Sequence, residues 1–198
     1  MQSSAPVRAT DPRPARTRAA IVRAVEGLAA DASTEITVNA IARAAGVSRS
    51  AFYAQFADLD DLAVAMLVDA FRDIGLDDLR ARDDHDADLR TLAVAANRRM
   101  LAHIGSRSAF YRASLDWRLS GRVHESVVAA YAQQVLATIR LLGVRVPGTV
   151  HAEDTARFIA GGAIAMLTAW LRDDAPAEQD AMAERLVAVM PEWLVGSD

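Results

Sequence analysis

Apolar residues recur every three to four positions along almost the whole chain, which is the spacing of one face of an α-helix. In residues 17–30, Ile21, Val25 and Leu28 stand at positions i, i+4 and i+7 and form one apolar stripe. The sequence shows no convincing alternation of apolar and polar residues, as a strand would have, and no internal repeat. It therefore predicts an all-α fold.

Capping residues and turn formers set the expected ends of about nine helices. Thr37 and Ser48 are good N-caps for two short helices, Asp58 caps a long one, and Gly46 suits a left-handed turn. Pro191 is expected to kink or shorten the last helix. The expected helices are 17–30, a short helix between Thr37 and Gly46, 49–55, 59–80, 88–105, 108–119, 122–142, 152–172 and 177–194.

Residues 37–56 have the layout of a helix-turn-helix, in which a short helix, a tight turn and a second short helix place the second helix in the DNA major groove. The small side chains of Ala44 and Ala45 let the two helices approach closely. Gly46 reverses the chain, Val47 fills the corner, and Ser48 restarts the helix with its N-terminal amides outward. Those amides carry the positive end of a helix dipole and suit a phosphate oxygen.

The same stretch resembles the TetR family of transcriptional regulators. That family's signature is similar to T-x-x-x-I-A-x-x-A-G-V-S-x-x-x-x-Y-x-x-F, followed by a long helix that begins x-x-K-x-x-L. The matching residues here are Thr37, Ile41, Ala42, Ala45, Gly46, Val47, Ser48, Tyr53, Phe56 and Leu62. The resemblance implies a DNA-binding domain near the N-terminus and a helical domain that binds an effector and forms a dimer.

One position departs from the family pattern. Where the family commonly has a lysine that holds a phosphate, this chain has Leu59, followed by two aspartates. Some affinity for the DNA backbone is therefore expected to be missing. Arg13, Arg16 and Arg18, which we assign to a flexible arm, are candidates to replace that contact.

The resemblance also assigns DNA contacts to individual residues. It gives Thr37 and Tyr53 phosphate contacts, and it places Arg49 and Ser50 at the base-facing start of the recognition helix. Gln55 is assigned to phosphate or base. Arg49 is the only long donor with several N–H groups in this set, so it is the candidate for reading a guanine edge.

Charge is divided unevenly along the chain, whose net charge is −4. Residues 1–56 carry seven Arg against four acidic residues, whereas residues 57–198 carry fifteen Arg against twenty-two. The basic end is therefore the one expected to contact phosphate. Every basic residue is Arg and none is Lys, which we attribute to the base composition of the source genome.

Aromatic and methionine side chains gather in the second part of the chain, where helical spacing alone makes most of them core. The resemblance implies a small-molecule cavity among these helices, and such cavities are largely apolar with a few polar groups. His103 is either the polar group of that cavity or a satisfied core histidine. The candidate ligand-binding residues are Met66, Met100, His103, Phe110, Tyr111, Trp117, Tyr131, Phe158, Met166 and Trp170.

A homodimer is expected, held by the last two long helices, because palindromic DNA sites require two-fold symmetry. Gly161, Gly162 and Ala165 permit close approach of a partner's backbone. A close contact within one subunit explains the two glycines equally well.

Several classes of chemistry are not expected. The absence of cysteine excludes disulfides and thiolate sites, and the four histidines form no i, i+4 ligand pair, so neither a metal nor another cofactor is expected. The longest apolar run, residues 158–171, is shorter than the roughly 20 residues that span a bilayer. The N-terminal residues lack the apolar stretch of a signal peptide, so we expect a cytoplasmic protein.

The favoured interpretation is a transcriptional regulator, most simply a repressor released from a palindromic double-stranded operator by a small apolar or amphipathic effector. Residues 1–15 are expected to be a disordered arm, 16–57 the DNA-binding domain and 58–198 the effector and dimer domain, with 58–80 as connecting helix. One alternative is a ligand-binding or interaction module whose helix-turn-helix has decayed, which only Leu59 favours. Another is a helical enzyme, for which no constellation of acid, base or metal-binding groups stands out.

Overall fold

The computed structural model describes residues 12–30, 35–82, 88–116, 120–143, 146–173 and 176–196. Over these ranges the regular structure is entirely α-helical, as the apolar spacing predicts. The helices are α1 (Arg13–Ala29), α2 (Val38–Ala45), α3 (Arg49–Tyr53), α4 (Leu59–Arg82), α5 (Leu89–Gly105), α6 (Ser108–Ser114), α7 (Ser120–Leu142), α8 (Ala152–Arg172), α9 (Gln179–Ala188) and α10 (Glu192–Val195).

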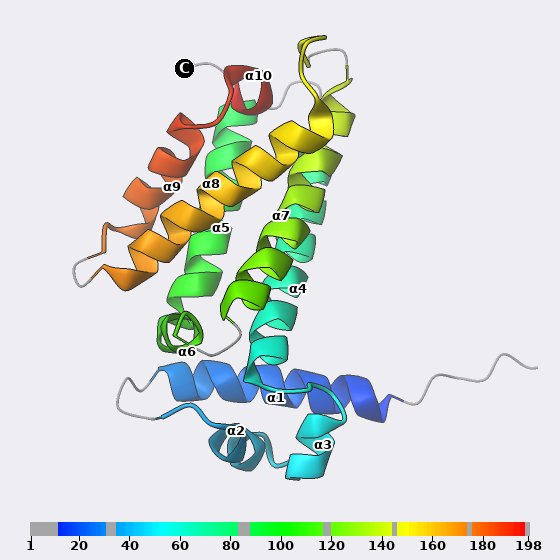
Figure 1. Cartoon of the computed structure of the whole chain (residues 1–198), viewed down its shortest axis with the longest axis vertical. Helices are drawn as coiled ribbons and strands as arrows, with labels where there is room; N and C mark the ends of the chain where they lie inside the picture. The colour runs from blue at the N-terminus through cyan, green and yellow to red at the C-terminus, as the bar shows by residue number, and fades with distance from the viewer. Residues whose placement is uncertain are drawn as a thin grey trace, which may run out of the picture.

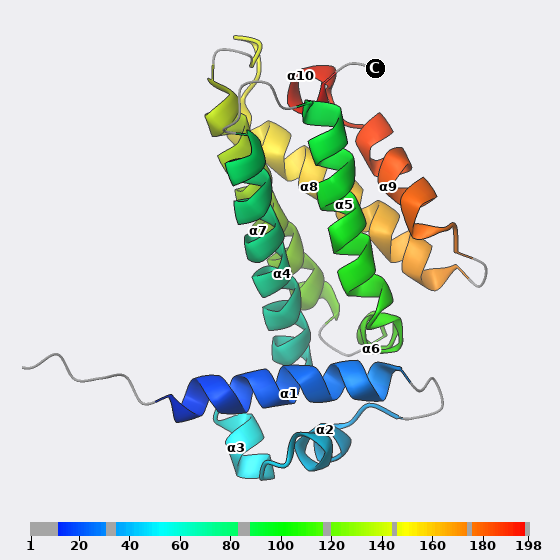
Figure 2. The same ribbon diagram turned by 180° about the vertical axis from the view of Figure 1, so that it is seen from behind.

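The helices form a small three-helix unit at one end and a larger bundle above it. Helix α1 lies across the base of the bundle, with α2 and α3 on its far side, and α4 rises from this unit into the bundle (Figure 1). Within the bundle α4 packs on α7 and α5, α8 packs on α7, and α5 packs on α9, as the view from behind also shows (Figure 2). Helix α4 is thus the continuous element that joins the two parts.

Apolar side chains hold the three-helix unit together. Ile21 and Val25 of α1, Ile41 of α2, and Phe52 on α3 with Phe56 just beyond it are all essentially inaccessible to solvent. The ring centroids of Phe52 and Phe56 lie 5.8 Å apart. Since these residues follow the i, i+4 spacing of their helices, burying them turns the opposite face of α3 outward.

Reciprocal caps fix the start of α4. The Asp58 carboxylate accepts a hydrogen bond of 2.8 Å from the Asp61 N–H, and the Asp61 carboxylate accepts one of 3.0 Å from the Ala57 N–H. Leu59 is partly buried against the core, so the residue at the family's usual lysine position serves packing here. With 24 residues, α4 is about 36 Å long at 1.5 Å per residue, which is enough to cross from one part into the other.

Several helix ends differ from those expected from the sequence; α6, for example, ends at Ser114 rather than at residue 119. Helix α1 begins at Arg13 rather than at residue 17, because Pro14 in the first turn lacks only an N–H that no helix uses there. Arg13, Arg16 and Arg18 therefore lie on a helix and not in an arm, while residues 1–11 fall outside the described residues. The expected helix 177–194 is divided into α9 and α10, because Pro191 is the N-cap of a new short helix.

Candidate functional sites

Side-chain caps and one glycine shape the turn between α2 and α3. Thr37 Oγ1 accepts a hydrogen bond of 3.2 Å from the Ala40 N–H, and Ser48 Oγ accepts one of 3.1 Å from the Ala51 N–H. Gly46 has φ +67°, a left-handed conformation that favours glycine. The sequence fixes this turn locally, and the turn holds α3 at an angle to α2.

The outward face of α3 is polar. Ser48, Arg49, Ser50 and Tyr53 are exposed and lie together, with the Tyr53 side chain 48% accessible. The guanidinium carbon of Arg49 lies 6.0 Å from the centre of the Tyr53 ring. Four of the six expected DNA-binding residues thus share one surface.

The other two expected DNA-binding residues, Thr37 and Gln55, are partly buried. Thr37 Oγ1 is already engaged as the cap of α2, yet its hydroxyl proton remains able to donate to a phosphate oxygen. The Thr37 side chain therefore stabilises the start of α2 and keeps a free donor.

Residues 21–66 match the family model described as bacterial regulatory proteins, tetR family. The N-terminal domain is a TetR family domain. The matched range includes most of α1, all of α2 and α3, and the first turns of α4, so it contains the whole polar face of α3. Among curated protein sequences none matches this chain significantly.

Solved structures resemble the chain over nearly its full length. The Thermus thermophilus FadR, a TetR family transcriptional repressor solved with lauroyl-CoA, has a TM-score of 0.62 at 16% identity over 90% of this chain and 94% of that one. EbrR, a multidrug binding protein solved with imidazole, has a TM-score of 0.53 at 24% identity over 90% and 95%. FadR of Bacillus halodurans has a TM-score of 0.54 at 14% identity over 94% and 97%. At these identities the likeness shows a shared fold.

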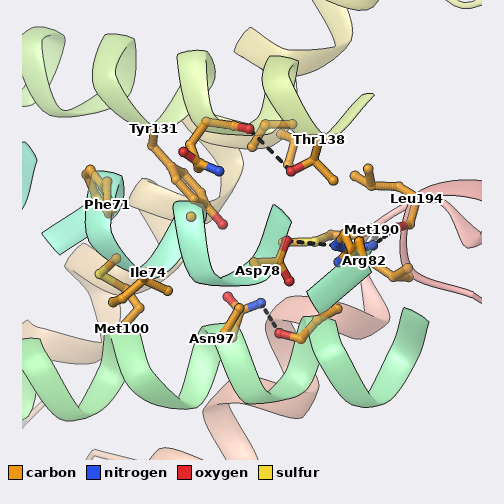
Figure 3. A pocket seen from close by; sticks show the side chains of 17 residues that line it. Phe71, Ile74, Asp78, Arg82, Asn97, Met100, Tyr131, Thr138, Met190 and Leu194 are labelled. Atoms are coloured by element: carbon orange, nitrogen blue, oxygen red, sulfur yellow. Dashed lines mark hydrogen bonds and ion pairs between the residues drawn. The ribbon is translucent and has the colours of Figure 1, made fainter. Parts of the chain in front are cut away.

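A cavity of about 80 Å³ lies between α4, α5 and α7 and is also lined by residues around α10 (Figure 3). Two of the expected ligand-binding residues, Met100 and Tyr131, line it. Its apolar lining includes Phe71, Ile74, Ile159 and Leu194. Its polar lining consists of Asp78, Arg82, Asn97, Tyr131, Gln134 and Thr138, most of which the sequence reasoning missed.

Several polar groups of this cavity are buried. Arg82 Nε donates to Asp78 Oδ2 at 2.7 Å, and the two side chains are only 4% and 9% exposed. Arg82 Nη1 also donates to the Leu194 carbonyl at 3.1 Å, and Asn97 Nδ2 donates to the Ala93 carbonyl at 2.9 Å. Burial, together with the negative charge of Asp78, raises the pKa of Tyr131 to about 12, so its hydroxyl stays neutral and able to donate.

A second cavity of about 70 Å³ lies towards the DNA-binding domain and is more apolar. Tyr111, another expected ligand-binding residue, lines it with Leu67, Ile104 and Ile164. Phe71 lines both cavities, and its ring stacks on Tyr131 with centroids 5.0 Å apart. Phe71 is thus the one described residue that lines both spaces.

His103 contacts Tyr111, which lines the second cavity. Its Nε2 lies 2.8 Å from the Tyr111 hydroxyl, within hydrogen-bond distance. Burial lowers the pKa of His103 and raises that of Tyr111, so both side chains are held neutral near pH 7. The histidine thus has a polar partner inside the subunit and positions a residue that lines the cavity.

The remaining expected ligand-binding residues lie elsewhere. Met66 and Phe110 are buried in the core, Met166 is partly buried, and Phe158 is 83% exposed on α8. The Trp170 indole N–H donates to the Ala177 carbonyl at 2.7 Å and so ties the end of α8 to the segment before α9. Trp117 lies outside the described residues.

An open face of α8 carries the expected dimer residues. Gly162 and Ala165 are exposed, Gly161 is partly buried, and Phe158 stands one turn before them. A Cβ atom added at either glycine would meet nothing within 4 Å. Contacts within the described part of the subunit therefore do not require glycine at these positions.

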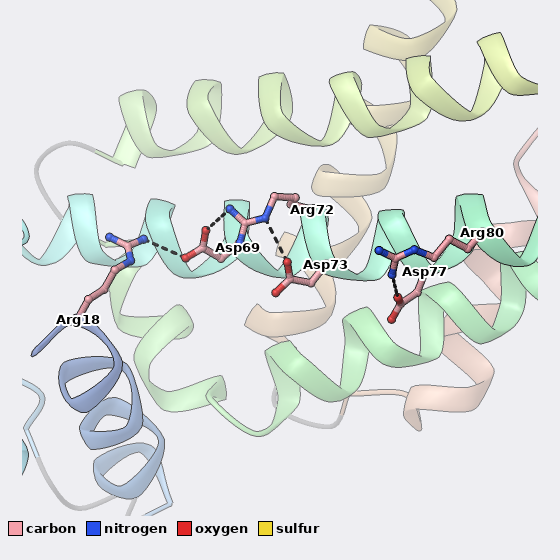
Figure 4. A network of polar contacts seen from close by, with 6 residues as sticks. All are labelled: Arg18, Asp69, Arg72, Asp73, Asp77 and Arg80. Carbon is pink, nitrogen blue, oxygen red and sulfur yellow. Dashed lines mark hydrogen bonds and ion pairs between the residues drawn. The ribbon is translucent and has the colours of Figure 1, made fainter. Parts of the chain in front are cut away.

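Ion pairs connect the DNA-binding domain to the bundle. Arg18 of α1 donates to Asp69 of α4 at 2.9 Å, and Asp69 also pairs with Arg72 at 3.0 Å (Figure 4). Glu26 of α1 pairs with Arg107 at the corner between α5 and α6. Arg18 is thus engaged within the subunit, and α1 is attached to the bundle at two points.

In the part of the chain that the structure describes, no group of three or more His, Asp or Glu side chains is placed to hold a metal ion. None of its helices is long and apolar enough to cross a membrane.

Proposed function

We propose that this protein is a cytoplasmic transcriptional repressor, a homodimer that binds a palindromic operator and leaves it when a small molecule occupies the bundle. The observation that carries the proposal is the polar outward face of α3, held by two caps and a left-handed glycine in a TetR family domain. We assign residues 16–57 to DNA binding, 58–80 to the connecting helix, and the rest of 58–198 to the effector and to dimerisation.

On this proposal α3 enters the major groove with its N-terminus foremost. Tyr53 and Thr37 donate to phosphate oxygens, the amides behind Ser48 face another phosphate, and Arg49 reads a base edge. Ser50 and Gln55 add contacts at the sides of the helix. Tyr53 is well suited to its role because nearly half of its side chain is exposed while its ring rests edge-on against Phe52.

Dimerisation is assigned to the open face of α8, together with α9. Phe158 is a large apolar side chain left 83% exposed, and Gly161, Gly162 and Ala165 extend the same face without bulk. Light scattering at micromolar concentration is expected to give a dimer, and Phe158→Asp a monomer that binds operator weakly. Arg112→Ala, at an exposed position on α6 away from this face, is expected to leave the dimer intact. A monomeric unaltered protein would refute this assignment.

The two cavities support an effector role. The Thermus FadR structure holds lauroyl-CoA and the EbrR structure holds imidazole, so this fold accommodates small molecules of different kinds. In the present chain both cavities are lined by α4, which also leads to the DNA-binding domain. A ligand changes operator affinity only if it binds one orientation of α4 more tightly than another. The resulting coupling free energy is typically about 1 to 3 kcal/mol.

The DNA assignment is tested by selecting a preferred duplex from a random library and titrating it by fluorescence anisotropy. Tyr53→Phe and Thr37→Ala are expected to weaken binding to preferred and random DNA alike, because phosphate contacts are independent of sequence. Arg49→Ala is expected also to reduce the preference between them. Equal losses on both duplexes for all three variants would contradict the role of Arg49.

The same titration separates the proposal from its main alternative. Because Leu59 packs into the core where the family commonly has lysine, a ligand-binding module without DNA affinity is the second candidate. Binding that weakens steeply with salt supports a regulator, since each phosphate contact releases counterions. Absence of any salt-dependent DNA binding would favour the ligand-binding module.

A further inference from the structure

Two buried polar atoms beside the larger cavity have no hydrogen-bond partner among the atoms that the structure describes. They are Asp78 Oδ1 and Gln134 Nε2. Asp78 is 7% exposed, and both residues line the cavity. Buried polar groups are nearly always paired, so two unpaired atoms of opposite kind at one cavity indicate a place for a bound polar group. The carboxylate oxygen requires a donor, and the amide N–H requires an acceptor.

The two residues reach the cavity from different helices, and the absence of a side chain at Gly75 leaves space for Gln134. Gln134 extends from α7 over Gly75 of α4, where a Cβ atom would lie only 1.8 Å from the Gln134 Cδ. Gly75 is three residues before Asp78, so both face the same side of α4. Asp78, Asn97 and Tyr131 point into the same space in Figure 3. Replacing Gly75 by any other residue would displace the amide from this site.

The charge around the cavity is already balanced. Asp78 is neutralised by Arg82, whose guanidinium also bonds the Leu194 carbonyl. An anionic ligand would approach the free oxygen of a carboxylate, and a cationic ligand would leave a net positive charge in a buried site. A neutral group that both donates and accepts meets the needs of both unpaired atoms and adds no charge.

The second cavity gives room for the rest of such a molecule. Phe71 is the shared wall between the larger cavity and the more apolar one lined by Tyr111, Leu67 and Ile164. Rotation of the Phe71 ring away from Tyr131 would join them into one elongated space with a polar end. An alkyl chain attached to the polar group has a path of this kind along α4.

We propose that the effector is a neutral amphiphile, whose hydroxyl or primary amide bridges Asp78 Oδ1 and Gln134 Nε2 and whose alkyl chain extends past Phe71. Only the name effector depends on the proposed function, because it assumes that this ligand controls DNA binding. The binding site itself is independent of whether the protein represses transcription.

Four compounds with the same alkyl chain test the proposal: octanamide, 1-octanol, octanoate and octylamine, each titrated into the full-length protein by calorimetry at pH 7. We expect octanamide and 1-octanol to bind about tenfold or more tightly than the two charged compounds. Gln134→Leu is expected to weaken octanamide binding about tenfold, because one hydrogen bond to the ligand is lost. Gln133→Leu, at the exposed neighbouring position on α7, is the matched control and should leave binding unchanged.

Three results would overturn the proposal: octanoate or octylamine binding as tightly as octanamide, no binding by any of the four, or equal octanamide affinity for the two glutamine variants. Operator titration in the presence of octanamide separates this failure from failure of the proposed function. If octanamide binds as expected but operator affinity is unchanged, the ligand site stands and the repressor mechanism fails.

Discussion

The outward face of α3 and the larger cavity of the bundle each contain a group of polar side chains, but the two groups relate to the fold in opposite ways. On α3, Arg49 and Tyr53 are exposed and project from a helix that Phe52 already anchors. In the cavity, Asp78 and Arg82 are buried and bond to each other. For Arg49 and Tyr53 we therefore expect DNA binding to be separable from stability, whereas for Asp78 and Arg82 ligand binding and stability are joined.

The largest effect is expected from Arg82→Leu. It leaves the Asp78 carboxylate buried without its cation, which typically lowers the free energy of unfolding by about 3 to 5 kcal/mol. The matched control is Arg80→Leu, two residues away, because Arg80 pairs with Asp77 on the exposed side of α4. Exposed pairs contribute about 0 to 1 kcal/mol, so the control should change little. Urea unfolding measures both, and equal changes would show that the Asp78–Arg82 pair has no special role.

A smaller loss is expected from Ser48→Ala, which removes the side-chain cap of α3. Loss of an N-cap hydrogen bond typically lowers the free energy of unfolding by about 1 kcal/mol. DNA affinity should fall on every sequence, because the frayed helix no longer presents its N-terminal amides. Ser126→Ala, at an exposed position on α7, serves as control in urea unfolding and DNA titration. Unchanged DNA binding by Ser48→Ala would argue against α3 as the contact helix.

A further effect, confined to mildly acid pH, is expected from His103. Burial lowers its pKa in the folded protein below the ordinary 6.5, so below that pH the unfolded chain binds more protons than the folded one. Stability should therefore decrease as pH falls through about 6.5, and the histidine's contribution is fully present above it. The slope of the urea midpoint between pH 7.5 and 5.5 should be smaller in His103→Gln. The exposed His151→Gln is the control, and an equal slope in both variants would remove His103 as the cause.

The smallest change in stability is expected from Tyr53→Phe, within about 0.5 kcal/mol, because the lost hydroxyl is at the surface. Its effect on DNA binding should nevertheless be large. A hydrogen bond to a charged group contributes about 1.5 to 3 kcal/mol, which corresponds to at least about tenfold in affinity. Thermal unfolding gives the change in stability, and fluorescence anisotropy on the same preparation gives the change in DNA affinity. A variant that binds DNA normally would contradict the separation of function from stability at this surface.

The helix-turn-helix could be predicted from the sequence because short-range rules fix it. The caps at Thr37 and Ser48 act within three residues, and Gly46 alone supplies the left-handed turn. The buried face of α3 follows from Phe52 and Phe56. Each of these signals is complete within about twenty residues of chain, so no knowledge of tertiary packing is needed.

The ligand site could not be predicted in this way, because its character depends on which helices cover α4. Asp78 and Arg82 stand at i and i+4, a spacing that sequence reasoning assigns to a solvated helix face. Only packing of α5, α7 and the α10 region over that face buries them. Phe110 and Phe158 show the same dependence, since both lie on helices and yet one is fully buried and the other 83% exposed.

Coupling of the two regions through α4 is tested most directly by reciprocal titration. Operator affinity is measured by anisotropy with and without saturating octanamide, and octanamide affinity by calorimetry with and without operator. Thermodynamic linkage requires the same factor in both directions, and a coupling of about 1 to 3 kcal/mol predicts a factor of about 5 to 150. We expect each ligand to weaken the other by one common factor in that range. Octanamide affinity that is the same on free and operator-bound protein would contradict the account.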